Sequence, residues 1–177
     1  MKILSSALLL ILFLSACSNN TQKIKVGDKY SLVLPDYLSE TDELNDDASL
    51  QYQNTEKEFY TIVIDENKQE LFDIIDQSEL LAGYQKNLEG YSKLLLDGLI
   101  ADAGLAVAPK VQDETINGLP AKILSTTLDA DGFRVYYKIA MIEGKADFYQ
   151  VMTWTMESNA TEHEEEMEGI VRSFVEK

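Results

Sequence analysis

The sequence predicts an α+β protein in which helices cover both faces of a mainly antiparallel sheet, giving an α/β/α sandwich. Segments of period-two alternation occupy both the start and the second half of the chain. Between them, from Asn67 to Leu99, apolar residues recur at helical spacing. The strands of the second half carry apolar side chains on both faces, so their sheet needs a cover on each side. An open β-sandwich is the alternative architecture.

The first part of the chain predicts two β-hairpins. Ile24 and Val26 alternate with lysines, residues 27–28 offer a tight turn, and residues 30–34 continue in β-favouring residues before Pro35. After an acidic polar segment, residues 50–52 and 59–64 flank the polar stretch 54–57, whose leading asparagine suits a turn. The first four strands are therefore expected to pair locally.

The middle part predicts two helices. Asn67 and Glu70 resemble a capping box before a short helix with Leu71, Ile74 and Ile75. A longer helix follows, whose apolar stripe consists of Leu80, Tyr84, Leu88, Tyr91, Leu95 and Leu99. Glycine weakens a helix, so Gly98 predicts a kink or an early end there.

The third part predicts a four-strand meander over residues 110–116, 119–128, 133–142 and 147–156, with turn residues in each gap. In the strand 133–142, alternate residues such as Ile139 and Met141 lie on one face, while Ala140 and Ile142 lie on the other. A last helix is expected to begin with Thr161 at the N-cap and Glu164 at N3. Its apolar stripe is Met167, Ile170, Val171 and Phe174.

These elements, in this order, resemble the PsbP-like superfamily over roughly residues 23–177. The resemblance rests on the segments Tyr30-Ser31-Leu32-Val33-Leu34-Pro35, Ile116-Asn117-Gly118-Leu119-Pro120-Ala121, the hairpin between Tyr136 and Trp154, and Ile170-Val171-Arg172-Ser173-Phe174. It implies a PsbP-like fold and a role in binding or assembly rather than catalysis. Where the superfamily often has Pro-x-Trp, this chain has Pro35-Asp36-Tyr37, and no binding residue is carried over.

The N-terminus predicts a lipid-anchored bacterial envelope protein. Residues 1–16 read as an export signal, because the apolar run after Lys2 is shorter than the roughly 20 residues of a membrane-spanning helix. The tetrad Leu14-Ser15-Ala16-Cys17 resembles a lipobox, so Cys17, the only cysteine, is the expected lipidation site. Residues 17–22 then form the lipidated cysteine and a short tether, which holds a single domain, 23–177, within about 20 Å of the membrane. An ordinary signal peptide followed by an incidental cysteine is the alternative.

The excess of acidic residues limits which classes of partner this domain can bind. The chain has 31 acidic and 15 basic residues, a net charge of −16. Such a surface repels nucleic-acid phosphates, so no nucleic-acid partner is expected. The acidity serves solubility or a basic protein partner. Ser18 stands where an aspartate resembles an inner-membrane retention signal, so we expect the outer membrane, facing the periplasm, in a Gram-negative cell.

The residue inventory predicts no catalytic residue, no metal site and no cofactor. His163, the only histidine, lies among glutamates and is expected to be solvated. Residues 129–132 resemble the start of a calcium loop, but Arg134 and Ala140 stand where that loop needs glycine and glutamate, so a hairpin turn is expected. The acidic segment 40–47 is expected to form an exposed loop. A protein that binds a small molecule or a metal, and a hydrolase with paired carboxylates, remain as alternatives.

Overall fold

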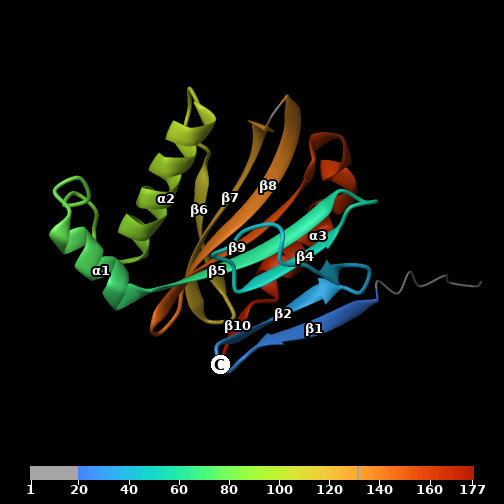
Figure 1. Ribbon diagram of the computed structural model, residues 1–177, viewed down its shortest axis with the longest axis horizontal. Helices are drawn as coiled ribbons and strands as arrows, with labels where there is room; N and C mark the ends of the chain where they lie inside the picture. Colours follow the sequence, from blue (N-terminus) through green and yellow to red (C-terminus); the bar gives the residue numbers. More distant parts are fainter. Residues whose placement is uncertain (1–19, 131) are drawn as a thin grey trace, which may run out of the picture.

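In the computed structural model, which describes residues 20–130 and 132–177, the strands form two antiparallel sheets (Figure 1). The larger sheet has the order β3-β4-β5-β9-β8-β7-β6, with bounds Ser39–Glu40, Leu50–Asn54, Phe59–Asn67, Asp147–Met156, Phe133–Glu143, Leu119–Ala130 and Val111–Ile116. The smaller sheet has the order β1-β2-β10, with bounds Thr21–Val26, Tyr30–Pro35 and Val175–Glu176. The predicted signal segment 1–16, the predicted lipidation site Cys17 and Asp131 lie outside the described residues.

The two predicted hairpins and the meander are confirmed, but the hairpins belong to different sheets. β1 pairs with β2 in the smaller sheet, and β4 pairs with β5 in the larger one. The C-terminal β10 adds to β2, a pairing that the sequence pattern does not predict. β1 begins at Thr21, so Thr21 and Gln22, which the sequence assigns to the tether, pair with Pro35 and Leu34.

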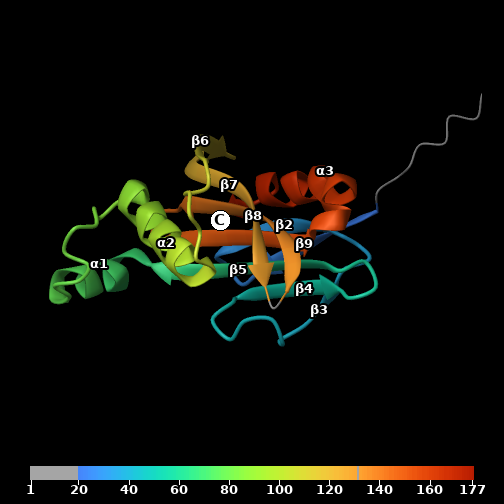
Figure 2. The same cartoon turned by 90° about the horizontal axis from the view of Figure 1, so that it is seen from above.

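The helices lie on opposite faces of the larger sheet, as expected for an α/β/α arrangement. Both views place α1 (Lys68–Gln77) and α2 (Leu88–Ala103) toward one end of the molecule and α3 (Ala160–Arg172) toward the other (Figures 1 and 2). A short 3₁₀ turn, η1 (Glu157–Asn159), precedes α3. None of the helices in the described part of the chain is long and apolar enough to cross a bilayer.

Asn67 caps α1 as predicted, but the prediction for the longer helix is wrong at both ends. Asn67 accepts hydrogen bonds from the backbone N–H groups of the next turn. α2 begins only at Leu88, because Asn87 caps it and the chain before it folds back tightly. A Cβ at Gly90 would lie 1.8 Å from the carbonyl oxygen of Gln85. The helix then continues through Gly98 and ends at Gly104, which adopts the left-handed conformation that glycine tolerates.

The start of α3 also differs from the prediction. The helix begins at Ala160, and the N-cap position is occupied by Asn159, which makes no side-chain cap bond. Its predicted apolar stripe is confirmed, since Met167, Ile170 and Val171 are all buried. The buried Lys138 of β8 fixes the outer side of the helix through an ion pair with Glu168, at 2.5 Å between Nζ and Oε2.

Two hydrophobic cores lie on the two faces of the larger sheet. The core under α3 is shared with the smaller sheet and includes Tyr30, Leu32, Leu34, Phe59, Val63, Ile142, Tyr149, Val151, Met167, Val171 and Phe174. The core under α1 and α2 includes Leu71, Ile75, Leu88, Tyr91, Leu124, Ile139, Met141 and Phe148. Ala140 and Ile142 therefore face α3 while Ile139 and Met141 face α2, as the alternation predicts.

Candidate functional site

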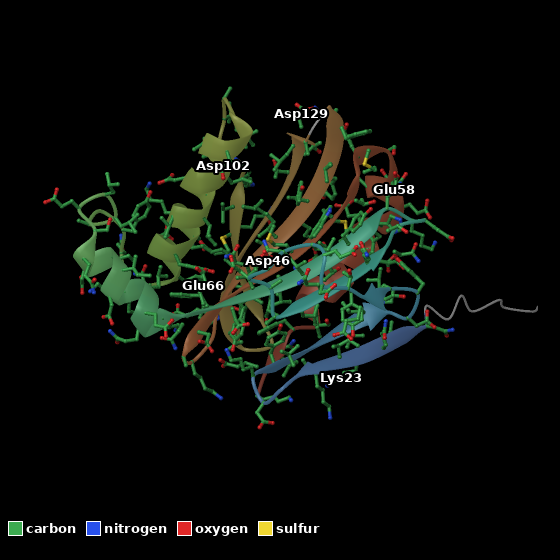
Figure 3. The ribbon with its side chains drawn as sticks, in the orientation of Figure 1. Lys23, Asp46, Glu58, Glu66, Asp102 and Asp129 are labelled. Atoms are coloured by element: carbon green, nitrogen blue, oxygen red, sulfur yellow. The ribbon has the colours of Figure 1, made fainter. Side chains whose placement is uncertain are left out.

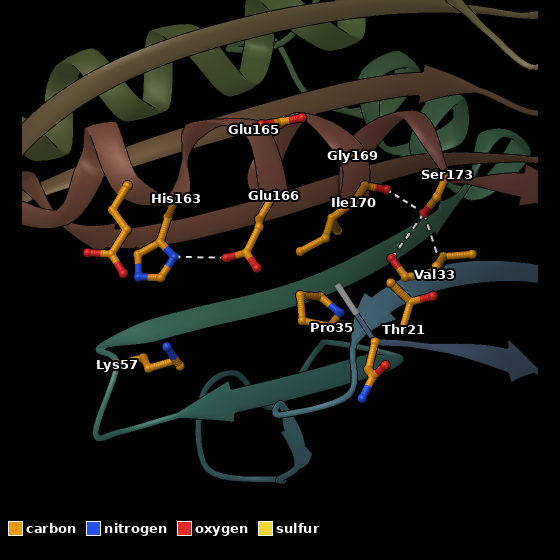
Figure 4. Close-up of a pocket in the computed structure, with 12 residues that line it drawn as sticks. Thr21, Val33, Pro35, Lys57, His163, Glu165, Glu166, Gly169, Ile170 and Ser173 are labelled. Carbon is orange, nitrogen blue, oxygen red and sulfur yellow. Dashed lines mark hydrogen bonds and ion pairs between the residues drawn. The ribbon is translucent and has the colours of Figure 1, made fainter. Parts of the chain in front are cut away.

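A pocket of about 540 Å³ opens between α3, the β1–β2 hairpin and the turn that joins β4 to β5 (Figure 4). We call it the α3–β2 pocket. It is lined by Asn20, Thr21, Val33, Pro35, Lys57, Glu162, His163, Glu165, Glu166, Gly169, Ile170 and Ser173. Its volume falls within the range of small-molecule and side-chain binding sites. One wall is a carboxylate-rich helix face, and the opposite wall is the edge of the small sheet.

His163 is buried, so the expectation of a solvated side chain is wrong. Only 3% of the residue is exposed, and its ring packs on Phe59 with 4.8 Å between ring centroids. The physical reason is helical periodicity, because His163 lies one turn before Met167 and extends the buried stripe of α3 by a turn. Its Nδ1 lies 2.9 Å from Oε2 of Glu166 (Figure 4).

Glu166 joins His163 to Tyr37, a residue of the segment that follows β2. The Tyr37 hydroxyl donates a 2.6 Å hydrogen bond to the same Oε2 atom. Burial raises the pKa of Tyr37, and the hydrogen bond to Glu166 and the nearby negative charges of Glu166 and Glu162 raise it further. Tyr37 therefore remains a hydrogen-bond donor at physiological pH.

This arrangement favours one tautomer of His163. An ionised carboxylate only accepts hydrogen bonds, so the Nδ1 atom facing Glu166 carries a hydrogen. In the neutral imidazole the Nε2 atom is then an acceptor. His163 thus offers the pocket one polar atom.

The polar groups around the pocket differ in how firmly they are held. Ser173 joins the end of α3 to β2, because its hydroxyl accepts from the backbone N–H of Val33 at 2.8 Å and donates to the carbonyl of Ile170 at 2.6 Å. Glu162 and Glu165 are exposed at the surface of α3. Lys57 lies over the ring of Tyr37, with Nζ 4.9 Å from the ring centroid. The pocket therefore has a fixed floor and a rim of exposed charges.

The other sequence candidates do not come together in a site. Asp129 and Ala130 end β7 and pair with Arg134 and Phe133 of β8, so the hairpin interpretation of residues 129–132 is confirmed. Asp131 itself lies outside the described residues. The acidic segment forms the loop after β3, and the side chain of Gln51 on β4 accepts hydrogen bonds from the loop N–H groups of Leu44 and Asn45. Asp46 and its acidic neighbours in this loop are exposed. Within residues 20–130 and 132–177, no group of three or more His, Cys, Asp or Glu side chains is placed to hold a metal ion.

Sequence reasoning missed the contact among Tyr37, His163 and Glu166. The helical period of α3 contains the signal for the burial of His163, and the spacing of three places Glu166 beside it on the helix. No local signal indicates Tyr37, which lies 129 residues from Glu166 along the chain. That contact exists because β2 and α3 pack together.

The solved structures that share this fold include two with TM-scores above 0.5 over most of both chains. Cyanobacterial PsbP (CyanoP) from Synechocystis has a TM-score of 0.59 and 10% identity, over 92% of this chain and 96% of that chain. The Ran-binding protein Mog1p from Saccharomyces cerevisiae has a TM-score of 0.56 and 14% identity, over 89% and 96%. The fold is therefore PsbP-like. No family model matches the chain, and no curated protein matches it by sequence.

Proposed function

We propose that this protein is a lipid-anchored module of the bacterial cell envelope that binds a protein partner and does not catalyse a reaction. The observation that carries the proposal is the α3–β2 pocket, which combines an open volume of about 540 Å³ with a buried polar floor. The similarity in fold to a Ran-binding protein and to a PsbP protein supports a binding role.

The chemistry of the pocket favours a basic side chain of the partner. Glu162, Glu165 and Glu166 line it from one helix, and Lys57 is the basic residue of the lining. The hydrogen bonds from Tyr37 and His163 both end on Oε2 of Glu166, so among the described residues Oε1 keeps its lone pairs for a ligand. A lysine or arginine entering the pocket would meet negative charge that the fold already positions, and the net charge of −16 attracts such a partner from a distance.

The proposed anchor gives this pocket a location. Asn20 and Thr21 line the pocket, and only three peptide units separate Asn20 from Cys17. Three residues reach about 10 Å at most, so lipidation of Cys17 would hold the pocket close to the membrane surface. The partner would then be a protein at the same surface, on the periplasmic side of the outer membrane in a Gram-negative cell.

Site-specific photo-crosslinking in cells tests the binding proposal. A photoreactive residue at position 165, on the rim of the pocket, should capture a discrete partner, whereas the same residue at position 79, exposed between α1 and α2, should not. With the photoreactive residue moved to another position in the pocket lining, the charge reversal Glu165→Lys should weaken capture of the partner. The matched reversal Glu79→Lys should leave capture of the partner unchanged. Equal capture by both positions, or equal loss in both reversals, would contradict the pocket as the binding site.

Membrane fractionation tests the anchor separately. Cys17→Ala should move the protein from the membrane fraction to the soluble fraction, because stable attachment needs the acyl chains. Cys17→Ser blocks the thioether with minimal change in size and should behave in the same way. If both variants stay in the membrane fraction, lipidation of Cys17 is not the anchor.

A further inference from the structure

A second, apolar cavity lies on the opposite face of the larger sheet, between α2 and strands β7, β8 and β9. It has a volume of about 300 Å³ and we call it the α2 groove. It is lined by Leu94, Leu95, Leu96, Gly98, Leu99, Asp102, Leu124, Ile139, Met141, Gln150 and Met152. It does not share a residue with the α3–β2 pocket.

The groove exists because only the first turn of α2 packs tightly on the sheet. Leu88, Gly90, Tyr91 and Ser92 are the buried residues of the helix, and the ring of Tyr91 stacks on Phe148 at 4.3 Å between centroids. From residue 93 onward every residue of α2 is half-buried or exposed. Three consecutive leucines, 94 to 96, point about 100° apart around the helix, so one sheet face cannot bury them all. These leucines and Leu99 line the groove from the side of the helix.

The lining indicates the size and nature of a ligand. The walls are aliphatic side chains and two methionines, and methionine adapts its shape to an apolar ligand. An apolar cavity of about 150 Å³ is large enough for benzene, so this groove accommodates an aliphatic chain of roughly twice that size. Such a chain would be buried between leucines and the sheet in the manner of a core side chain.

The end of the groove indicates the charge of the head group. Asp102 lies exposed on the last turn of α2, where Figure 3 labels it. The helix ends one residue later, its C-terminal carbonyl groups carry partial negative charge, and its last turn holds no basic residue. An ammonium group would complement both charges, whereas a carboxylate or phosphate would be repelled.

We infer that the α2 groove binds a single-chain amphiphile, with its aliphatic chain between α2 and the sheet and its ammonium group beside Asp102. This site is independent of the proposed partner at the α3–β2 pocket. The two sites lie on opposite faces of the sheet, so a negative result at one site does not contradict the proposal for the other.

The chain contains its own reporter for this binding. Trp154 is the only tryptophan, and on β9 it lies two residues from Met152 on the same face of the sheet. Its ring stacks between Tyr60, at 5.4 Å, and Tyr137, at 6.0 Å. An undecylamine that carries the dansyl group at the far end of its chain and keeps a free amino group, used below its critical micelle concentration, should show saturable energy transfer from Trp154. Unlabelled dodecylamine should displace it.

Two variants at one position test whether the groove is the site. Gly98 lines the groove and a Cβ there would meet nothing within 4 Å, so Gly98→Phe and Gly98→Ala should both fold. The phenylalanine ring should weaken binding by about tenfold by excluding part of the chain, while Gly98→Ala should bind like the unsubstituted protein. Absence of transfer in the unsubstituted protein, or equal binding by the two variants, would overturn the site.

A third variant tests the head group. Asp102→Asn should weaken binding of the amine probe several-fold at low salt and leave the binding of a neutral dansyl-labelled alcohol unchanged. Asp46→Asn, an exposed carboxylate in the loop after β3, is the matched control and should bind the amine normally. If the unsubstituted protein does not prefer the amine to the alcohol, the assignment of an ammonium head group is wrong.

Discussion

The two faces of the larger sheet are covered in different ways. Under α3 the sheet meets both a helix and the smaller sheet, and side chains such as Tyr30, Phe59 and Phe174 are completely buried. On the opposite face the sheet meets α1 and α2, of which α2 is buried only in its first turn, and a groove of about 300 Å³ remains. The smaller sheet therefore closes the core on one face, while the helices leave the other face partly open.

The face of the larger sheet that α3 and the smaller sheet cover, which we call the closed side, also explains why its pocket is polar. The α3–β2 pocket lies at the rim where helix and smaller sheet meet, so its floor is polar and is held by hydrogen bonds from Tyr37 and His163 to Glu166. The α2 groove lies where packing is incomplete, so its walls are apolar. One fold thus provides two cavities of opposite character.

The largest expected effect is the loss of an aromatic side chain from the closed side. Phe174 is 0% exposed and packs against Tyr30 and Tyr149, so Phe174→Ala should lower the free energy of unfolding by about 3–5 kcal/mol. Urea denaturation measures this. Phe133→Ala, at the exposed first residue of β8, is the control and should change the free energy of unfolding by less than about 0.5 kcal/mol. Similar losses in both variants would contradict the assigned cores.

A leucine-to-alanine substitution on each face of the larger sheet tests directly whether the two faces differ in packing. Leu34→Ala, in the closed core, should cost about 2–5 kcal/mol because it leaves a cavity. Leu99→Ala, on the half-buried part of α2, should cost only about 1 kcal/mol because the leucine already borders open space. Equal costs in urea denaturation would mean that α2 packs on the larger sheet as tightly as β2 packs in its core.

A smaller, stabilising effect is expected within α2. Gly98 has helical backbone and its Cβ position is open, so Gly98→Ala should raise the free energy of unfolding by about 0.5–1 kcal/mol. Thermal unfolding followed by circular dichroism measures the gain. A matched Gly90→Ala should instead destabilise the protein, because a Cβ there would collide with the backbone of Gln85. A destabilising Gly98→Ala would show that the groove is closed.

The smallest effect concerns the ion pair that joins the two sheets. Lys29, next to β2, pairs with Asp65 of β5. Burial raises the pKa of Asp65, but hydrogen bonds, led by that from Lys29, outweigh it and hold the pKa below its ordinary value of 3.8. The hydrogen bond to Asp65 raises the pKa of Lys29 above 10.5. Solvent screening keeps the contribution of such a pair small.

The signs of these shifts give the pH dependence. The Asp65 contribution to stability is complete above about pH 4 and is lost as the pH falls through the lowered pKa. The Lys29 contribution is complete below pH 10.5 and is lost as the pH rises through the raised pKa. In urea titrations at several pH values, Asp65→Asn and Lys29→Met should each reduce the fall in the free energy of unfolding as the pH drops below about 4. An acid-side slope unchanged in both variants would mean that the pair does not join the sheets.

Most of the fold was predictable because it is encoded locally. Turn residues at positions 117–118 and 143–144 mark the meander, and Asn67 marks the start of α1. The start of α2 was misplaced because Leu80 and Tyr84 fit a helical period that the chain does not continue. A period reports which residues share a face, but it does not report whether the backbone between them is helical.

The candidate site was predictable only in part. The spacing of His163, Glu166 and Met167 on α3 contains the information that places the histidine on the buried face. The contribution of Tyr37 was not predictable, because it depends on how the smaller sheet docks against α3. The same holds for the α2 groove, whose residues come from a helix and three strands.

The sequence by itself determined the strand order along the chain, the amphipathic stripe of α3 and the acidic charge, because periodicity, turn chemistry and composition act within a few residues. It also carries the lipobox-like tetrad that predicts lipidation of Cys17. The tertiary structure decided that β1, β2 and β10 form a separate sheet, that His163 and Tyr37 meet at Glu166, and that α2 leaves a groove. These features depend on which surfaces pack together over long separations, and a local pattern specifies that a surface is buried without specifying its partner.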